Sequence, residues 1–370
     1  MWARNLLFIV VVLAGIATLT AALFPSQRPP RVPHFNPREA QDPDFRASVD
    51  QVNEEFRKEW AEAGLKPAPR ASDLQIARRL SLALTGTVPS LQEIRQMEAV
   101  PADQRLPWRV AELLQDRRFG DYWAERLARA YVGTEDGPFL VYRRRRFVSW
   151  LSDELMKDHP YDDLTRNLIA GQGLWTDNPA TNFLTVTIEQ GAGKNQPDPE
   201  RLAGRVSRVF LGVRLDCAQC HNHPFEKWKR EDFQGLAAFF GQAKLGFTGM
   251  HDEGGDYQTL NRKTGAKETV EPRVPFLPEL LPAQGTRRRQ LADWITNPRN
   301  LYFSRATVNR VWALMFGRPL VEPVDSVPTS GSLPPVLHLL ADDFVAHHYD
   351  LQRLIRVIAA TEVFQLDSAA

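Results

Sequence analysis

The sequence predicts a mostly α-helical protein, in which a multi-helical domain with a small irregular or β insert is followed by a second, shorter helical domain. Apolar residues recur at helical spacing through most of the chain, and capping residues mark where helices begin. This periodicity disappears between Gly241 and Gln284, where Gly, Pro and Thr become frequent. The 370 residues are 43% hydrophobic and 25% charged, with a formal net charge of +1. This is an ordinary globular composition, and it predicts no nucleic acid partner.

The amino terminus carries an apolar segment, so residues 1–24 are expected to act as a signal anchor or a signal peptide. The run from Leu6 to Phe24 is close to the roughly 20 residues that a helix needs to span a bilayer. Arg4 precedes it as a short basic region, and Thr20 to Ala22 resemble a weak signal-peptidase site. We favour an uncleaved anchor over residues 6–24, because an ordinary signal peptide has only about 7–15 apolar residues. The large domain that follows is therefore expected on the exported, periplasm-like side of the inner membrane.

Residues 25–51 are predicted to form a stiff, Pro-rich tether, and helices are expected from about Val52. Within the first helical domain, over residues 52–242, Gly86 predicts the end of a helix. Two pairs of residues have the spacing of a capping box and predict helix starts: Ser72 with Gln75, and Ser90 with Glu93. One helix carries an apolar face that we assign to the core: Phe119, Tyr122, Trp123, Leu127 and Tyr131.

Both cysteines of the chain lie in one pentad, Cys217-Ala218-Gln219-Cys220-His221. Apolar stripes before and after the pentad predict that it forms a loop between two amphipathic helices. Two thiols at this spacing can form thioether bonds to the two vinyl groups of a haem, and the histidine after the second thiol can ligate the iron. The pentad therefore predicts a c-type haem held by Cys217, Cys220 and His221.

The same residues fit two other interpretations. Thiolate and imidazole are the usual ligands of zinc, so Cys217, Cys220, His221 and His223 form an alternative metal set. Against zinc, Cys220 and His221 are adjacent and reach one tetrahedral ion only with strain. The two cysteines of an exported chain can also form a disulfide, which would close a loop of about four residues and stabilise the protein by roughly 2 kcal/mol. All three interpretations stay open at this stage.

The pentad does not fix a second axial ligand for a haem. His223 follows His221 so closely that we expect both on the same side of the haem. Met250 and His251 lie in a Gly-containing stretch further along and are the nearest candidates for a distal ligand. A thioether ligand would raise the reduction potential relative to a second imidazole.

The rest of the chain is divided into an irregular insert over residues 243–284, with a short β-hairpin, and a second helical domain over residues 285–370. The sequence contains no P-loop, dinucleotide-binding fingerprint or nucleophile elbow. No catalytic residue is predicted.

Longer motifs around the pentad are those of a known family. Phe210 to Phe225 is such a motif, followed by Asp232-Phe233 and by Gly235 to Phe240. Three upstream segments share the likeness: Gly64 to Pro67, Arg78 to Gly86, and Pro160 to Asp162. Together, from about Val52 to Gln242, they resemble the second planctomycete cytochrome-associated domain family, a domain of unknown function.

Later motifs resemble the planctomycete-specific domain that usually follows that family: Arg289 to Trp294, Asn297-Pro298, Phe303 to Trp312, Phe316 to Arg318 and Leu320 to Asp325. One motif departs from the pattern, because Gly317-Arg318-Pro319 stands where the family usually has Gly-Arg-Gly. Ala370 also comes before the second domain would normally end. The resemblance implies an exported protein of cell-envelope bacteria, and we expect a separate partner chain to supply the missing part of the second domain.

Three functional hypotheses follow. The first is an exported, membrane-anchored protein whose Cys/His centre binds haem c and transfers electrons to a redox or cell-envelope protein partner. The second is a non-redox cell-envelope scaffold in which zinc or a disulfide occupies the same centre. The third is a metal-dependent hydrolase, for which the sequence offers no identifiable general base.

Overall fold

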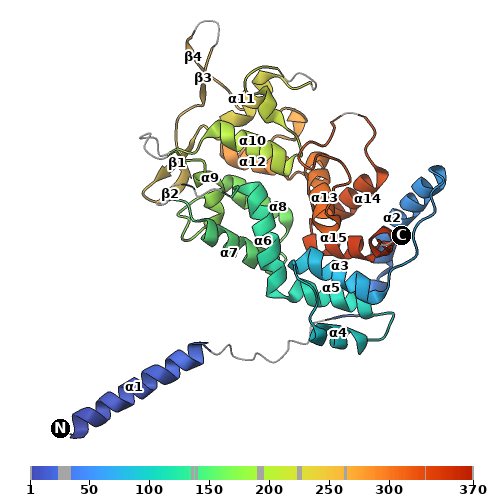
Figure 1. Cartoon of the computed structure of the whole chain (residues 1–370). Helices are drawn as coiled ribbons and strands as arrows, with labels where there is room; N and C mark the ends of the chain where they lie inside the picture. Colours follow the sequence, from blue (N-terminus) through green and yellow to red (C-terminus); the bar gives the residue numbers. More distant parts are fainter. Residues whose placement is uncertain are drawn as a thin grey trace. The chain divides into compact units, whose positions relative to one another are not determined.

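The computed structural model describes residues 2–23, 35–134, 137, 141–189, 196–222, 227–261, 265–329 and 331–368, with the backbone alone at residues 3, 4 and 17–23. These residues contain sixteen α-helices and four short strands (Figure 1). The prediction of a mostly helical protein is therefore confirmed. The chain divides into two compact units, Met1–His34 and Phe35–Ala370.

The first unit contains helix α1, Trp2–Leu23, which covers most of the predicted anchor. Across the side chains that the structure describes, no helix offers a stretch long and apolar enough to cross a membrane. Phe24 and the tether residues 25–34 lie outside the described residues.

The second unit is built from the other helices and the four strands. Nine helices precede the cysteine pentad: α2 (Pro43–Glu62), α3 (Asp73–Thr85), α4 (Leu91–Glu98), α5 (Arg105–Gln115), α6 (Arg117–Tyr131), α7 (Arg144–Met156), α8 (Tyr161–Ala170), α9 (Asn182–Thr185) and α10 (Pro199–Phe210). Six described helices follow it: α11 (Arg230–Ala238), α12 (Arg287–Ile295), α13 (Leu301–Phe316), α14 (Pro335–Ala346), α15 (Leu351–Ala360) and α16 (Glu362–Gln365). Short 3-10 helices occur at four places: η1 (Glu39–Gln41), η2 (Pro179–Thr181), η3 (Leu215–Ala218) and η4 (Pro278–Leu280).

Helix α2 begins earlier than expected, inside the predicted tether over residues 25–51. The Asp42 side chain accepts hydrogen bonds from the backbone N–H groups of Asp44 and Phe45. Pro43 occupies the first turn, where its fixed φ suits a helix and its missing N–H leaves no donor unpaired. The boundary at Val52 is therefore corrected to Pro43, because a local cap outweighs the proline-rich composition around it.

The other predicted helix boundaries are confirmed. Both capping boxes form, with Ser72 and Gln75 at the start of α3 and Ser90 and Glu93 at the start of α4. Gly86 ends α3 in the left-handed conformation, at a φ of 69°. The predicted aromatic face of α6 is buried, with Tyr122 partly buried at its edge.

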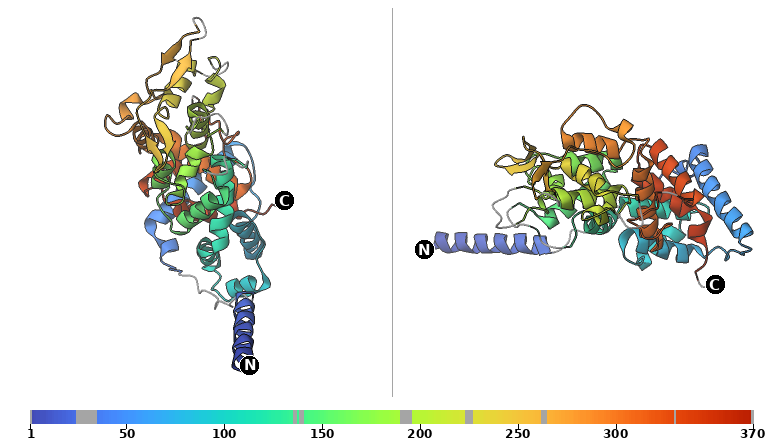
Figure 2. Two further views of the ribbon diagram at one scale, coloured as in Figure 1. Left: turned by 90° about the vertical axis from the view of Figure 1, so that its left-hand side faces the viewer. Right: turned by 90° about the horizontal axis from the view of Figure 1, so that it is seen from above.

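The two helical domains expected from the sequence share one hydrophobic core. The ring of Tyr161 on α8 stacks on that of Phe303 on α13, with a centroid distance of 5.8 Å. The Tyr161 backbone N–H also donates to the Tyr349 carbonyl at 3.1 Å. Two further views show the red C-terminal helices beside the blue α2, which α14 and α15 contact (Figure 2). Residues 285–370 thus pack into the same compact unit as residues 52–242.

The predicted β insert consists of two antiparallel hairpins. Strand β1 (Ala243–Gly246) pairs with β2 (Gly249–Asp252), and β3 (Gln258–Leu260) pairs with β4 (Lys267–Thr269). The first hairpin is attached to the helical core by a bridge between Met250 and Gly173. Figure 1 shows the second hairpin extending beyond α11.

Replacing Asp158 by Asn is expected to make the protein less sensitive to pH. Burial, and then the neighbouring Asp350 carboxylate, raise the pKa of half-buried Asp158 from 3.8 to about 6. The folded state therefore binds this proton more tightly, so the stabilisation is complete below about pH 4 and is lost as the pH rises through about 6. Asn also tolerates the left-handed φ of 55° at this position.

We expect Asp158→Asn to raise the free energy of unfolding at pH 7 by about 1 kcal/mol, after allowance for solvent screening. Urea titrations between pH 4 and 8 measure this effect. The exposed Asp50→Asn variant, on α2, is the control and should follow the parent protein. An Asp158→Asn protein that lost as much stability as the parent between pH 4 and 6 would contradict the prediction.

Candidate functional site

The cysteine pentad forms a turn at the protein surface between α10 and α11, as predicted. Its first residues belong to η3, Leu215–Ala218. Leu215 and Ala218 are fully buried and attach the turn to the core, while Cys217 between them faces outward. The two buried side chains therefore hold this part of the backbone in place, and the thiol of Cys217 between them is accessible to solvent.

All three predicted haem-binding side chains are exposed on this turn. Cys217 and Cys220 are both free thiols in the structure. His221 follows directly and is exposed as well. The turn thus offers two thiols and one imidazole to a ligand approaching from solvent.

The His221 ring is oriented by the backbone of the next residue. Its Nδ1 lies 2.7 Å from the Asn222 carbonyl oxygen. A carbonyl can only accept, so in the neutral ring this contact assigns the hydrogen to Nδ1 and leaves the lone pair on Nε2. The Asn222 side-chain oxygen accepts a hydrogen bond from the backbone N–H of Arg230, at the start of α11, at 3.1 Å. The available Nε2 and the backbone-bonded Nδ1 are an arrangement typical of metal-ligating histidines.

A second set of contacts joins the pentad to α10 and to the β insert. The Gln219 side-chain amide donates to Glu200 at 2.6 Å, and the Tyr257 hydroxyl donates to the other oxygen of Glu200 at 2.5 Å. Burial, and then the hydrogen bond and charge of Glu200, raise the pKa of Tyr257 above its ordinary value. Glu200 and Tyr257 were not singled out from the sequence, because nothing local indicates that residues so far apart along the chain meet.

Two ion pairs also fix the turn. Asp216, beside Cys217, pairs with Arg208 on α10. Arg214, just before the turn, pairs with Asp325 at 2.8 Å. Burial alone would raise the pKa of Asp216, but the hydrogen bond and charge of Arg208 hold it below its ordinary value. The turn is therefore held by residues of both sequence-defined domains.

The other predicted ligands lie elsewhere or outside the described residues. His223 falls in the segment 223–226, which the structure does not describe. Met250 is almost fully buried in β2, so its sulfur is not offered to the exposed turn. His251 is half-buried, with Nδ1 at 3.0 Å from the Gly249 carbonyl oxygen. Within the described ranges, no three His, Cys, Asp or Glu side chains are grouped closely enough to hold a metal ion.

The fold and the turn define a class of protein: a helical scaffold that displays a Cys-x-x-Cys-His turn between two of its helices. The chain belongs to the family PSCyt2, described as a protein of unknown function (DUF1549), which matches residues 51–244. Residues 287–370 match PSD1, also described as a protein of unknown function (DUF1553). These matches confirm the resemblance and the domain order predicted from the sequence. No curated protein and no solved structure matches the chain.

Proposed function

We propose that this protein acts on the exported side of the inner membrane and transfers electrons through a haem that is attached covalently to Cys217 and Cys220, with His221 as the ligand of its iron. The observation that carries the proposal is the presence of two free, exposed thiols on the same surface turn as an imidazole with an available Nε2. When bound, a haem supplies a one-electron redox couple.

The thiols fit the covalent step. In each attachment a thiol S–H adds across one vinyl group, forming a carbon–sulfur bond and placing the hydrogen on the other vinyl carbon. The addition needs no external oxidant or reductant, but it does need reduced thiols, which the turn provides. Because both thiols are exposed, attachment would leave the buried Leu215 and Ala218 in the core.

The imidazole fits the role of axial ligand. With a ring hydrogen directed to the Asn222 carbonyl, the neutral form of His221 presents the Nε2 lone pair to a metal. The Asn222 side chain is itself bonded to the start of α11, so the ligand is oriented by helical structure. A rigid ligand loses less conformational entropy on binding than a free side chain.

Location and partner form part of the same proposal. The apolar segment over residues 6–24 would keep the protein at the membrane, where haem-bearing domains meet redox partners. A haem on an exposed turn would present an edge directly to a second protein of the cell envelope. A separate chain carrying the remainder of the second domain is one such partner.

Cys217→Ser is expected to remove most of the covalently bound haem, because only the Cys220 thiol remains to form a thioether bond. The test is a haem-stained denaturing gel of the full chain, produced together with a c-type haem maturation system. The parent should stain, because thioether bonds survive denaturation, and Cys217→Ser should lose most of the stain. Gln219→Ala is the matched control, because it alters the same turn and breaks the bond to Glu200 but removes no haem ligand. It should stain like the parent.

Other outcomes would overturn the haem proposal in favour of the remaining hypotheses. A parent protein without stain but with one zinc per chain, reduced by His223→Ala, would identify the zinc scaffold. Metal-dependent hydrolysis of a model ester by that zinc form would instead identify the hydrolase. A parent with neither haem nor zinc and no thiol reactive toward a maleimide would identify the disulfide.

A further inference from the structure

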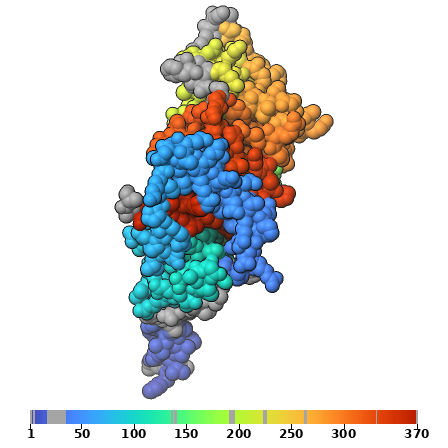
Figure 3. Space-filling view, turned by 90° about the vertical axis from the view of Figure 1, so that its right-hand side faces the viewer, coloured from blue at the N-terminus to red at the C-terminus, as the bar shows by residue number. Residues whose placement is uncertain are grey.

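A separate cavity of about 480 Å³ lies among α2, α5 and α15, and none of the pentad residues lines it. Figure 3 shows this face hollowed between the blue N-terminal part of the unit and teal α5, with the red C-terminal helices at the base. Pockets for small molecules typically measure about 300–1,000 Å³, so this cavity has the volume to enclose one.

The cavity has an apolar wall. The apolar lining residues on α2, α5 and α15 are Phe45, Leu106, Pro107, Val110, Ala359 and Ala360. Removing an apolar ligand surface from water against this wall would stabilise a complex. An apolar wall does not distinguish between cationic, neutral and anionic ligands. The charged residues that line the cavity therefore determine which ligand charge is favoured.

Two of the three lining arginines are paired with carboxylates that do not line the cavity. Arg353 lies 2.7 Å from Asp44 and 3.0 Å from Asp343. Arg70 lies 2.8 Å from Asp73. The charges of these two guanidinium groups are already balanced by those carboxylates, so the groups attract an anionic ligand only weakly.

The lining carboxylates outnumber the remaining arginine. Asp42 and Asp350 cap the amino termini of α2 and α15, whose dipoles offset part of their charge. Glu39 and Asp103 are exposed, and Arg356, which donates a hydrogen bond to the side-chain oxygen of Gln352, is the one lining arginine left to offset their charge.

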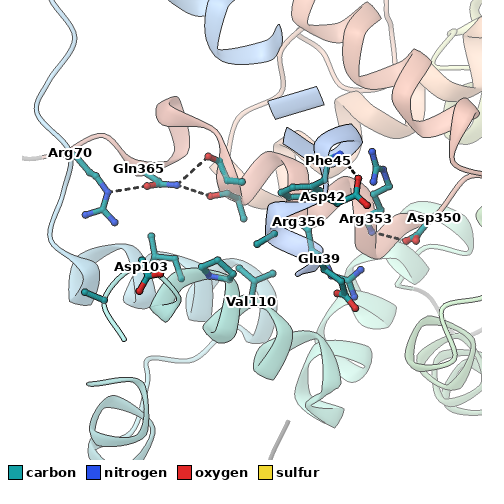
Figure 4. Close-up of a pocket in the computed structure, with 16 residues that line it drawn as sticks. Glu39, Asp42, Phe45, Arg70, Asp103, Val110, Asp350, Arg353, Arg356 and Gln365 are labelled. Atoms are coloured by element: carbon teal, nitrogen blue, oxygen red, sulfur yellow. Dashed lines mark hydrogen bonds between the residues drawn. The ribbon is translucent and has the colours of Figure 1, made fainter. Parts of the chain in front are cut away.

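Figure 4 shows the apolar wall between these charged groups, with Arg70 and Asp103 toward one end and Glu39, Asp350 and Arg356 toward the other. The lining therefore carries an excess of negative charge. Asp158, next to Asp350, has a pKa raised to about 6 by burial and by the Asp350 charge, as expected beside a negative potential.

We propose that this cavity binds a small molecule with an apolar body and one positively charged amine. The apolar body would lie against Phe45 and Val110, and the ammonium group would donate hydrogen bonds to Glu39 or Asp103. An anion of the same shape would meet uncompensated carboxylates and bind less tightly. This inference is independent of the haem proposal and concerns a different face of the protein.

The test compares three probes of matched shape on the full chain: phenethylamine, phenethyl alcohol and 3-phenylpropionate. Titration calorimetry should give the lowest dissociation constant for the amine, about tenfold below that of the alcohol, because hydrogen bonds to charged groups are stronger than neutral ones. The acid should bind most weakly. Binding of the acid as tightly as the amine, or no detectable amine binding, would overturn the proposal.

Variants of the lining residues test whether the amine binds in this cavity and whether Glu39 and Asp103 supply the negative charge. Glu39→Gln combined with Asp103→Asn should weaken amine binding to the level of the alcohol and leave alcohol binding unchanged. Glu98→Gln removes an exposed carboxylate that does not line the cavity, and it should have no effect. Ala360→Phe should fill the cavity and weaken all three probes, with folding checked by circular dichroism. Amine binding unaffected by the double variant would overturn the proposal.

Discussion

Replacing Arg288 by methionine should lower the free energy of unfolding by about 3–5 kcal/mol. The Arg288 side chain is fully buried at the start of α12, and its Nε donates to Asp252 of β2 at 2.5 Å. A second nitrogen donates to the carbonyl oxygens of Ile169 and Gly171, at the end of α8, at 3.2 and 2.8 Å. One side chain therefore joins the β insert, a helix of the first domain and a helix of the second.

The loss is large because methionine leaves Asp252 buried without its partner. The side chain of Asp252 is only 8% exposed, so its charge cannot be solvated in place of the lost pair. Its Oδ2 and the Nη2 of Arg288 already have no hydrogen-bond partner among the described residues. The hydrogen-bonding capacity of this ion pair is thus only partly used. Replacing both residues should therefore lower the free energy of unfolding less than replacing Arg288 alone.

Three variants test this account by urea unfolding of the full chain. Arg288→Met should show the large loss, and Arg288→Met combined with Asp252→Leu should recover at least half of it. Arg289→Met is the control on the neighbouring residue, whose pair with Asp293 is largely exposed, and it should change stability by less than about 1 kcal/mol. A single Arg288→Met loss no larger than that of Arg289→Met would contradict the account.

Features set by neighbouring residues were predictable from the sequence. The two capping boxes depend on side chains three positions apart, and both were predicted correctly. The position of the cysteine turn between two helices also follows from local apolar spacing. The start of α2 differs from the expectation although its signal is local, since the Asp42-Pro43 cap begins the helix inside the segment whose proline-rich composition predicts a tether.

Contacts between distant segments were not predictable. Arg288 and Asp252 are 36 positions apart, and Glu200 and Tyr257 are 57 apart. No periodicity or spacing rule relates such residues, since their meeting depends on how whole elements pack. The same reason explains why the sequence suggested two successive helical domains, whereas the structure joins them through one core. The residues of the turn were therefore predicted, but the groups that support them were not.

Gly249→Ala should strongly destabilise the β insert. Gly249 has a φ of 97°, a conformation that an alanine adopts only with strain of about 1–3 kcal/mol. A Cβ atom at this position would also lie 2.1 Å from the backbone carbonyl carbon of Gly173. That contact is with backbone, so no side-chain rotation can relieve it, and overpacking of this kind adds about 1–3 kcal/mol or more.

The clash falls on the bridge that attaches the hairpin to the helical core. The Met250 N–H donates to the Gly173 carbonyl at 2.9 Å, and the Gly173 N–H donates to the Met250 carbonyl at 2.8 Å. Separating the two backbones to admit a methyl group would break both hydrogen bonds and expose the buried Met250 side chain. We therefore expect Gly249→Ala to lower the free energy of unfolding by about 3–6 kcal/mol.

Hydrogen exchange separates a local effect from global loss of stability. The amides of Met250 and Gly173 should lose protection in Gly249→Ala before those of α6, which is packed in the core and distant in sequence. Gly254→Ala provides the control in the same insert, because its added Cβ would meet no atom within 4 Å, and it should change stability by less than about 0.5 kcal/mol. If the two alanine variants unfold at the same urea concentration, the close approach of Gly249 to Gly173 does not constrain this protein.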